Sequence, residues 1–211
     1  PEPLIFAAWY RDLTRLVYAD ELGAIFTDYW ELRPVFMRNV MRHDTDWCDD
    51  ISTGPKESCP QIVTRALESA LDKLVATYGD DPGKWRWGEP HSARSAHQLF
   101  SGQPMLGELF DIDLPADGGG ETLNRALYRI SDGDNPFRQY HGASLRAIYD
   151  LDDPDRSLFI HSSGQSGNRM SGQYSSFAER WRNLEYVSMT TRRSDIEAGA
   201  MGTLVLQPPA P

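Results

Sequence analysis

The stretch from Pro60 to Tyr78 constrains the fold more than any other part of the chain. Its apolar residues come in doublets four residues apart, which places them on one face of an α-helix. Pro60 suits the first turn of such a helix, and Gly79 suits the position just after its end. The pattern therefore predicts a helix over residues 60–78 with one continuous apolar face made of Ile62, Val63, Ala66, Leu67, Ala70, Leu71, Leu74 and Val75.

Two more helices are predicted upstream of this one. Leu4–Gly23 has apolar residues at roughly helical spacing and ends on a glycine. Glu31–Arg42 shows another apolar face, with Pro34 in its first turn, and Thr27 or Asp28 could cap it. The first part of the chain is therefore expected to be a mainly helical lobe.

Two cysteines, Cys48 and Cys59, bracket a polar loop between the predicted helices, and the sequence contains no others. Two cysteines that close a short loop indicate a disulfide, which would stabilise the fold by about 3 kcal/mol in the chain-entropy model. The alternative is a pair of buried free thiols. A zinc site is not favoured, because the two thiols lack CxxC spacing and the histidines are distant.

Strand patterns dominate the second half of the chain. Alternation predicts strands at Glu121–Ile130, Ser144–Leu151, Arg156–His161 and Gly202–Gln207, whereas Met105–Asp113 looks irregular. The short turn between the second and third of these predicts an antiparallel hairpin. The fold class that follows is α+β, with a helical lobe at residues 1–113 and a β-rich part at 114–211.

Composition excludes two classes of partner. The 211 residues carry a formal net charge of −10, which argues against binding to a phosphate backbone. No apolar run approaches the roughly 18 residues that a membrane helix needs. We therefore expect neither nucleic acid nor a membrane as a partner.

The aromatic segment from Lys84 to Pro90 is expected to pack on a core. Trp85 and Trp87 lie in an extended stretch, where paired tryptophans more often fill a core than stack on a ligand. His91 and His97 follow, six residues apart, which is not the spacing of a helical ligand pair. We expect them to be solvated or to cap backbone groups.

A catalytic triad of Ser166, His161 and Asp150 can be drawn in the segment after the hairpin. The flanking GQSG sequence is not a GxSxG nucleophile elbow, however, and nothing requires His161 to reach the turn. Gly164 and Gly167 instead suit a turn of unusual backbone conformation, with serines satisfying its backbone groups. This stretch is expected to be structural.

Two other candidate sites are weaker. Asp132, Asp134 and Asn135 have the composition of a calcium loop but lack the later glutamate of an EF-hand. The amine of Pro1 could serve as a base only if it lay in a small apolar pocket, and a helix follows it directly. A sequence that starts with Pro1 in this way is expected to be a processed or truncated piece.

The order of motifs along the whole chain resembles the C-terminal end of the penicillin acylase family. The matching elements are Trp47-Cys48 with Cys59, the Pro60–Tyr78 helix, Trp85-Arg86-Trp87-Gly88 with His91, Gly119-Gly120-Glu121-Thr122-Leu123-Asn124, Ala143-Ser144-Leu145-Arg146, Asp150-Leu151-Asp152, Gly164-Gln165-Ser166-Gly167, and Ser171, Tyr174 and Trp181. No one of these motifs is decisive, and it is their ordered combination that is specific. Relatives often have histidine after the GQSG motif, whereas this chain has Asn168, which also favours a structural turn.

The resemblance implies an N-terminal-nucleophile amidohydrolase of the αββα type. In that family a precursor with a signal peptide cleaves itself into two chains, and the new N-terminal serine of the larger chain is the nucleophile, with its own α-amino group as base. An oxyanion hole completes the site, and the substrates are acyl amides such as penicillins or N-acyl homoserine lactones. The enzyme would be periplasmic or secreted, in keeping with a disulfide.

The resemblance covers only the end of the large chain. The nucleophile, the oxyanion asparagine and any calcium ligands belong upstream, so no residue here inherits a catalytic, cofactor-binding or metal-binding role. The implied partners are the small chain and the N-terminal part of the large chain. The fragment is expected to be inactive alone and to expose apolar surface where the rest would pack. The alternatives are a free-standing structural or binding module and a self-contained serine hydrolase that uses Ser166.

Overall fold

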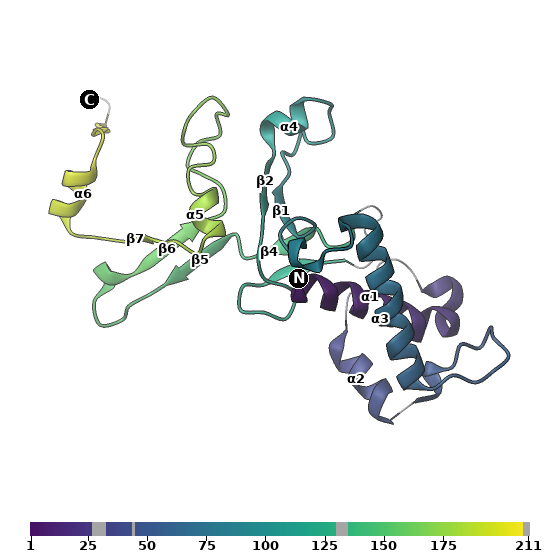
Figure 1. The fold of residues 1–211 in the computed structure, drawn as a ribbon. Helices are drawn as coiled ribbons and strands as arrows, with labels where there is room; N and C mark the ends of the chain where they lie inside the picture. The colour runs from purple at the N-terminus through teal and green to yellow at the C-terminus, as the bar shows by residue number, and fades with distance from the viewer. Residues whose placement is uncertain (27–32, 44, 130–134, 209–211) are drawn as a thin grey trace. The chain divides into compact units, whose positions relative to one another are not determined.

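A computed structural model describes residues 1–26, 33–43, 45–129 and 135–208. The Cα positions group the chain into two compact units, Pro1–Ala143 and Ser144–Pro211, which are described one at a time (Figure 1). Glu31 and Leu32 of the predicted second helix, its candidate caps Thr27 and Asp28, and Asp132 and Asp134 of the candidate calcium loop lie outside the described residues.

Three helices form the core of the first unit. They are α1 (Glu2–Leu22), α2 (Pro34–His43) and α3 (Cys59–Tyr78). The backbone amide of Ser58 donates to Gln61 Oε1 over 2.8 Å at the start of α3, which satisfies one of the groups that the helix start leaves unpaired. Gly23 and Gly79 follow α1 and α3 with φ of 48° and 85°, a region that favours glycine. The predicted helices are confirmed within the described residues.

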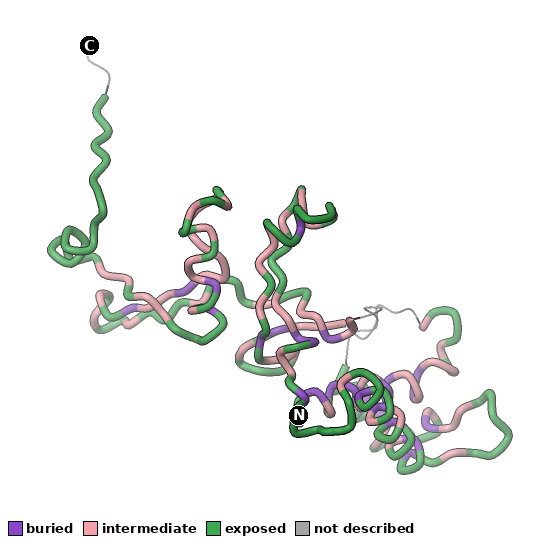
Figure 2. The backbone as a smooth tube through the Cα atoms, turned by 45° about the horizontal axis from the view of Figure 1, so that its top comes forward, coloured by how far each residue is buried: buried purple, intermediate pink, exposed green. Residues whose placement is uncertain are grey.

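Helices α1 and α3 pack along one another. Half of the apolar face predicted for α3 is buried, at Ile62, Ala66, Ala70 and Leu74, whereas Leu67 and Val75 are 40% and 43% exposed. Figure 2 draws the buried parts of the helices in purple. The contact also has a polar component. Lys73 Nζ on α3 lies 2.6 Å from a carboxylate oxygen of Asp12 on α1, whose side chain is only 5% exposed. Because a buried carboxylate must be paired, this ion pair ties the two helices to one register.

A four-stranded sheet completes the first unit, with strand order β2-β1-β4-β3. Its strands are β1 (Ser92–Ser95), β2 (Ile112–Pro115), β3 (Ala126–Tyr128) and β4 (Gln139–Gly142), and helix α4 (Leu106–Phe110) precedes β2. Neighbours pair antiparallel except β1 and β4, which form one parallel bridge. The sheet draws strands from both sides of residue 113, and the division there stays a prediction.

The second unit is built on a three-stranded antiparallel sheet with order β5-β6-β7. The strands are β5 (Leu145–Ile148), β6 (Leu158–His161) and β7 (Val187–Ser188). The β5–β6 hairpin confirms the predicted pairing, with Leu145 opposite His161 and Ile148 opposite Leu158. Helix α5 (Ala178–Arg182) packs on β6 and buries Trp181, and α6 (Arg193–Gly199) follows β7. Short 3₁₀ turns are η1 (Gly23–Ile25), η2 (Thr45–Cys48), η3 (Pro82–Lys84) and η4 (Pro154–Arg156).

The predicted strand at Glu121–Ile130 is mostly wrong. Of residues 121–129, which the structure describes, only Ala126–Tyr128 forms a strand, and Leu123 is fully exposed. Ile130 lies outside the described residues. The hydroxyl of Thr122 accepts from the amide of Gly119 over 2.9 Å, and the Asn124 side chain donates to Asp117 O over 3.1 Å. Such local side-chain bonds offer the backbone an alternative to a ladder, and here they hold a turn.

Two other element predictions need correction. Met105–Asp113, expected to be irregular, contains α4 and the start of β2. Gly202–Gln207, expected to be a strand, pairs with no strand in the described part of the chain. Its Leu204 and Leu206 are 84% and 85% exposed. The segment before the C-terminus is drawn green, as exposed, in Figure 2. Alternating apolar residues favour a strand, but a strand forms only where an edge is available to pair with it. The α+β class is confirmed.

Candidate functional site

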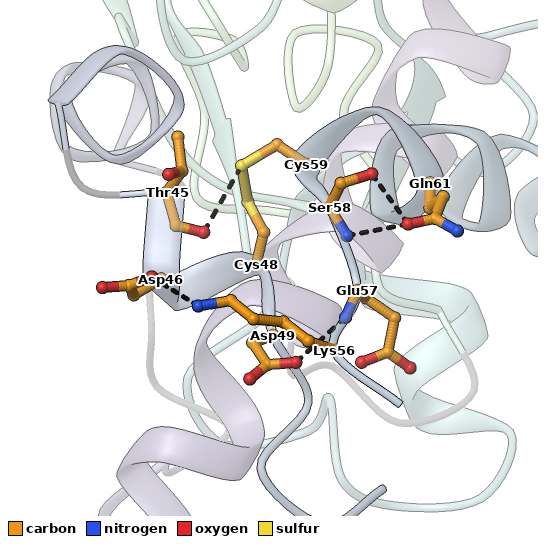
Figure 3. The surroundings of a disulfide bond; sticks show 9 residues. All are labelled: Thr45, Asp46, Cys48, Asp49, Lys56, Glu57, Ser58, Cys59 and Gln61. Atoms are coloured by element: carbon orange, nitrogen blue, oxygen red, sulfur yellow. Dashed lines mark hydrogen bonds and ion pairs between the residues drawn. A yellow bond between two sulfur atoms is a disulfide. The ribbon is translucent and has the colours of Figure 1, made fainter. Parts of the chain in front are cut away.

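The Cys48–Cys59 pair forms the disulfide that the sequence predicts (Figure 3). The bond links η2 to the first residue of α3 across 11 positions. Free thiols and a thiolate zinc site are therefore both wrong, because neither sulfur is available as a thiolate. Cys48 is fully buried beside Tyr18 and Trp47, whose rings meet edge to face with centroids 5.6 Å apart.

Polar contacts close the loop that the disulfide anchors. Lys56 Nζ lies 2.8 Å from Asp46 Oδ1, and the Glu57 amide donates to Asp49 Oδ1 over 3.0 Å (Figure 3). The hydrogen bond from Lys56 lowers the pKa of the Asp46 carboxyl. The Lys56–Asp46 pair is exposed and the Glu57–Asp49 contact is part-buried. Because these groups satisfy one another, the loop provides a covalent link and no reactive group.

The structure does not assemble Ser166, His161 and Asp150 into a triad. His161 Nδ1 lies 3.1 Å from the hydroxyl of Ser163, its near neighbour. The Ser166 hydroxyl accepts from the Asn168 amide over 3.1 Å, and Asp150 Oδ1 accepts from two amides of its own turn. Each side chain thus stabilises local backbone, and no hydrogen bond joins the three among the described residues.

The glycine of the GQSG motif has a steric role. The amides of Gln165 and Ser166 both donate to Gln173 O, over 2.8 and 3.2 Å, which folds the segment back on itself. A Cβ on Gly164 would collide with the carbonyl oxygens of Gln173 and Tyr174. This close backbone approach requires glycine. The segment is a structural turn, but the predicted unusual backbone conformation is wrong: neither Gly164 nor Gly167 has a positive φ, and a Cβ at Gly167 would meet no neighbour.

His91 was expected to be solvated or capping, and this is wrong. Its side chain is fully buried, its ring stacks on Trp87 at a centroid distance of 4.4 Å, and Nδ1 lies 2.7 Å from Phe137 O. Burial lowers the pKa of the imidazole below its ordinary value. Trp85 is buried nearby, so core packing is confirmed for that tryptophan. His91 therefore belongs to an aromatic core layer, which the four-residue spacing from Trp87 could have suggested.

His97 does cap backbone groups, as predicted. Its Nδ1 accepts from the amides of Leu99 and Phe100, each over 3.3 Å. Asp111, which the sequence did not single out, accepts from the His97 amide over 2.7 Å and from Arg94 over 2.6 Å. The backbone hydrogen bond from His97 is the largest cause of the lowered pKa of Asp111. A carboxylate satisfied in this way holds the loop before β2 in place.

A cavity of about 500 Å³ lies in the first unit, bounded by α1, the glycines at positions 118–120 and β3. Tyr10, a residue that the sequence did not single out, is 7% exposed, and its hydroxyl has no hydrogen-bond partner among the described residues. Burial raises the pKa of Tyr10 to about 12. The wall contains four other aromatic side chains together with glycine backbone and charged side chains. The aromatic residues are Phe6, Trp87, Tyr128 and Tyr140, and the charged ones are Arg33, Glu121 and Arg125. The cavity offers a mixed surface of rings, tyrosine hydroxyls and charged side chains, and its described lining contains no serine, cysteine or histidine that could form a nucleophile–base pair.

Metal and amine chemistry find no support in the described residues. No group of three or more histidine, cysteine, aspartate or glutamate side chains is placed to hold a metal ion within residues 1–26, 33–43, 45–129 and 135–208. The Pro1 amine pairs with the exposed Glu2 carboxylate over 3.2 Å, so it does not occupy the apolar pocket that base chemistry needs. None of the helices in the described segments is long and apolar enough to cross a membrane.

Comparison with known proteins identifies the family. The profile of the penicillin amidase family matches residues 1–198. An acyl-homoserine lactone acylase QuiP from Pseudomonas fluorescens is 26% identical over 92% of this chain and 24% of its own length. A penicillin acylase 2 proenzyme from a Pseudomonas species is 26% identical over 85% of this chain and 21% of its own length.

Among solved structures, a thermostable penicillin G acylase from Alcaligenes faecalis matches with a TM-score of 0.49 and 18% identity, over 99% of this chain and 38% of that one. The chain thus spans about a quarter of the length of the curated relatives it matches. The profile match covers nearly all of the sequence, and the motifs that carried the resemblance lie within it. The chain belongs to the penicillin amidase family.

Proposed function

We propose that this chain is the C-terminal part of the large chain of a penicillin-acylase-like amidohydrolase. The parent enzyme would hydrolyse the amide bond of acylated substrates such as penicillins, N-acyl homoserine lactones or similar compounds. The observation that supports this most is the family match over residues 1–198, together with relatives named as acylases of both substrate types.

The proposed catalytic groups lie outside this chain. The nucleophile is the N-terminal serine of the parent's large chain, and its α-amino group acts as base. An oxyanion hole, also outside, stabilises the tetrahedral intermediate. The role of the present chain is to supply strands and a helical lobe to the αββα fold. The local duties of Ser166 and His161 in the described turn are consistent with that role.

The proposed function also implies partner chains and a cellular location. Its partners would be the small chain and the N-terminal part of the large chain, and a calcium ion, where one is bound, would belong to the parent. A periplasmic or secreted location is supported by the Cys48–Cys59 disulfide, because such bonds persist in oxidising compartments.

The test compares the complete acylase with the isolated 211-residue chain. Each is incubated with a penicillin and with an N-acyl homoserine lactone, and release of the free amine is followed. We expect hydrolysis by the complete protein and only the buffer rate with the isolated chain. Hydrolysis of neither substrate type by the complete protein would favour a non-catalytic structural or binding module, and an enzyme-like rate from the isolated chain would refute an external nucleophile.

A further inference from the structure

Strand β5 forms one edge of the sheet in the second unit. The strand order β5-β6-β7 gives β5 a partner only on its β6 side within the described residues (Figure 1). An edge strand exposes unpaired backbone groups to any strand that can approach, and proteins usually block such edges with lysine, proline, a bulge or a covering segment. β5 reads Leu-Arg-Ala-Ile and pairs with β6 in unbroken register, so it contains no lysine, proline or bulge.

The register shows which backbone groups point away from β6. The amide of Ser162 donates to Ser144 O over 2.9 Å, and Leu145 lies opposite His161. In an antiparallel pair, hydrogen-bonded and non-hydrogen-bonded positions alternate along the strand. Arg146 and Ile148 therefore direct their amides toward β6, whereas Leu145 and Ala147 direct theirs to the open side.

The side chains around this edge are apolar and exposed. Leu145 and Ile148 are 57% and 54% exposed, and Tyr149, the next residue, is 65% exposed. The one charged residue of β5 is already engaged. The Arg146 guanidinium lies 4.4 Å from the centre of the Trp181 ring and donates to Trp181 O over 2.6 Å. The Arg146 side chain is therefore held against α5 and does not block pairing at the open edge of β5.

We propose that the open edge of β5 is a docking site for a β-strand from the remaining part of the parent acylase. The incoming strand would pair with the amides and carbonyls of Leu145 and Ala147 and would cover the exposed side chains with apolar residues of its own. This inference rests on the proposed function, since the strand would come from the part of the parent acylase that lies outside this chain. The chain covers only 24% of the length of one acylase relative.

Two other occupants fit less well. A second copy of this chain would bring together two molecules of formal net charge −10 each, which opposes edge-to-edge association. The chain's own segment Gly202–Gln207 has a strand-like pattern, yet in the same unit it pairs with no described strand. A strand from the parent carries neither objection.

Hydrogen exchange of individual amides in the complete acylase tests the proposal. We expect the amides of Leu145 and Ala147 to exchange as slowly as those of Arg146 and Ile148, about 100-fold or more below the rate of an open edge. The Arg146 and Ile148 amides serve as internal controls, because their partners lie on β6. Fast exchange at Leu145 and Ala147 beside slow exchange at the two controls would overturn the proposal.

A matched pair of variants tests whether the outward amides of β5 pair with a docked strand. Ala147→Pro removes the outward amide, which an edge strand tolerates, and Ala147→Thr keeps it. In the complete acylase we expect Ala147→Pro to speed exchange at Leu145 about tenfold, and Ala147→Thr to leave it within about twofold. Equal exchange rates at Leu145 in the two variants would overturn an assignment of that amide to the docked strand.

The remaining outcomes separate the occupants and the two proposals. Protection that rises with protein concentration would identify a second copy, and protection lost on deletion of residues 200–211 would identify the chain's own end; either overturns the proposal. Slow exchange in a complete protein that hydrolyses no acyl amide would support the docking site while refuting the proposed function. Fast exchange at Leu145 and Ala147 in a complete protein that hydrolyses acyl amides would refute the docking site while supporting the proposed function.

Discussion

Removal of the Cys48–Cys59 disulfide should destabilise the first unit by an amount that the structure allows us to estimate. The bond closes a loop with a sequence separation of 11. In the chain-entropy model a loop of that length restricts the unfolded state by about 3 kcal/mol at 25 °C. Because single domains are stable by only about 5–15 kcal/mol, this loss is a large fraction of the total.

The assay is urea unfolding followed by circular dichroism at the helical band, with and without reductant. We expect reduction to lower the free energy of unfolding by about 3 kcal/mol with little loss of helix in buffer alone. The double variant Cys48→Ala/Cys59→Ala is the second arm. Cys48 is fully buried, so this variant should lose a further part of the stability through the missing sulfur atoms.

The comparison of reduced protein with the double variant separates the covalent contribution from the packing contribution. The variant without reductant and the variant with reductant should unfold at the same urea concentration, which controls for effects of the reductant itself. A loss below about 1 kcal/mol on complete reduction would refute the loop-entropy reasoning. It would mean that the polar contacts of the loop and the start of α3 hold the segment equally well without the bond.

Three further predictions concern single residues. Trp85→Ala should lower the free energy of unfolding by about 3–5 kcal/mol, because Trp85 is 1% exposed and its indole N–H donates to Gly79 O. Urea unfolding measures the loss, and a loss no larger than that of the control variant Trp85→Phe would contradict the prediction. Burial lowers the folded-state pKa of His91, so its contribution is fully present above about pH 6.5 and is lost as pH falls toward the folded value. Stability of wild type should therefore fall more between pH 7.5 and 5.5 than stability of His91→Gln, and equal slopes would show that His91 is not the group responsible. Ser166→Ala should leave kcat/KM of the complete acylase within about twofold, whereas a loss near 10⁴-fold would restore Ser166 as a nucleophile.

The helices could be predicted from the sequence because their information is local. The apolar doublets of Pro60–Tyr78 fix a face, and Gly79 fixes an end, without reference to any distant residue. The cysteine pair was equally accessible, since a loop bounded by Cys48 and Cys59 leaves no other intramolecular pairing in this chain.

The strand predictions failed where the outcome depends on competition or on a partner. At Thr122 and Asn124, side-chain hydrogen bonds to the backbone hold a turn in a segment whose alternation favours a strand. At Gly202–Gln207 the apolar alternation is present, but no edge in the described residues pairs with it. A pattern reports what a segment can form, and pairing decides whether it does.

The environment of His91 could not be predicted for a related reason. Its burial depends in part on Phe137, which lies 46 residues further along the chain. The carbonyl oxygen of Phe137 lies 2.7 Å from Nδ1 of the His91 ring and can only accept a hydrogen bond. The spacing from Trp87 could have suggested the stacked ring, but nothing near His91 in the sequence points to this carbonyl. Contacts of such sequence separation are set by topology, which a single sequence reveals only in outline.

The pairing of α1 with α3 also sets an order of events during synthesis. The Asp12–Lys73 contact joins residues 61 positions apart, so α1 is made well before its partner exists. At about 5–20 residues per second the ribosome needs roughly 3–12 s to complete that interval. Throughout that time the face of α1 that packs on α3 is without that partner, and it is a ready target for chaperones that hold nascent chains.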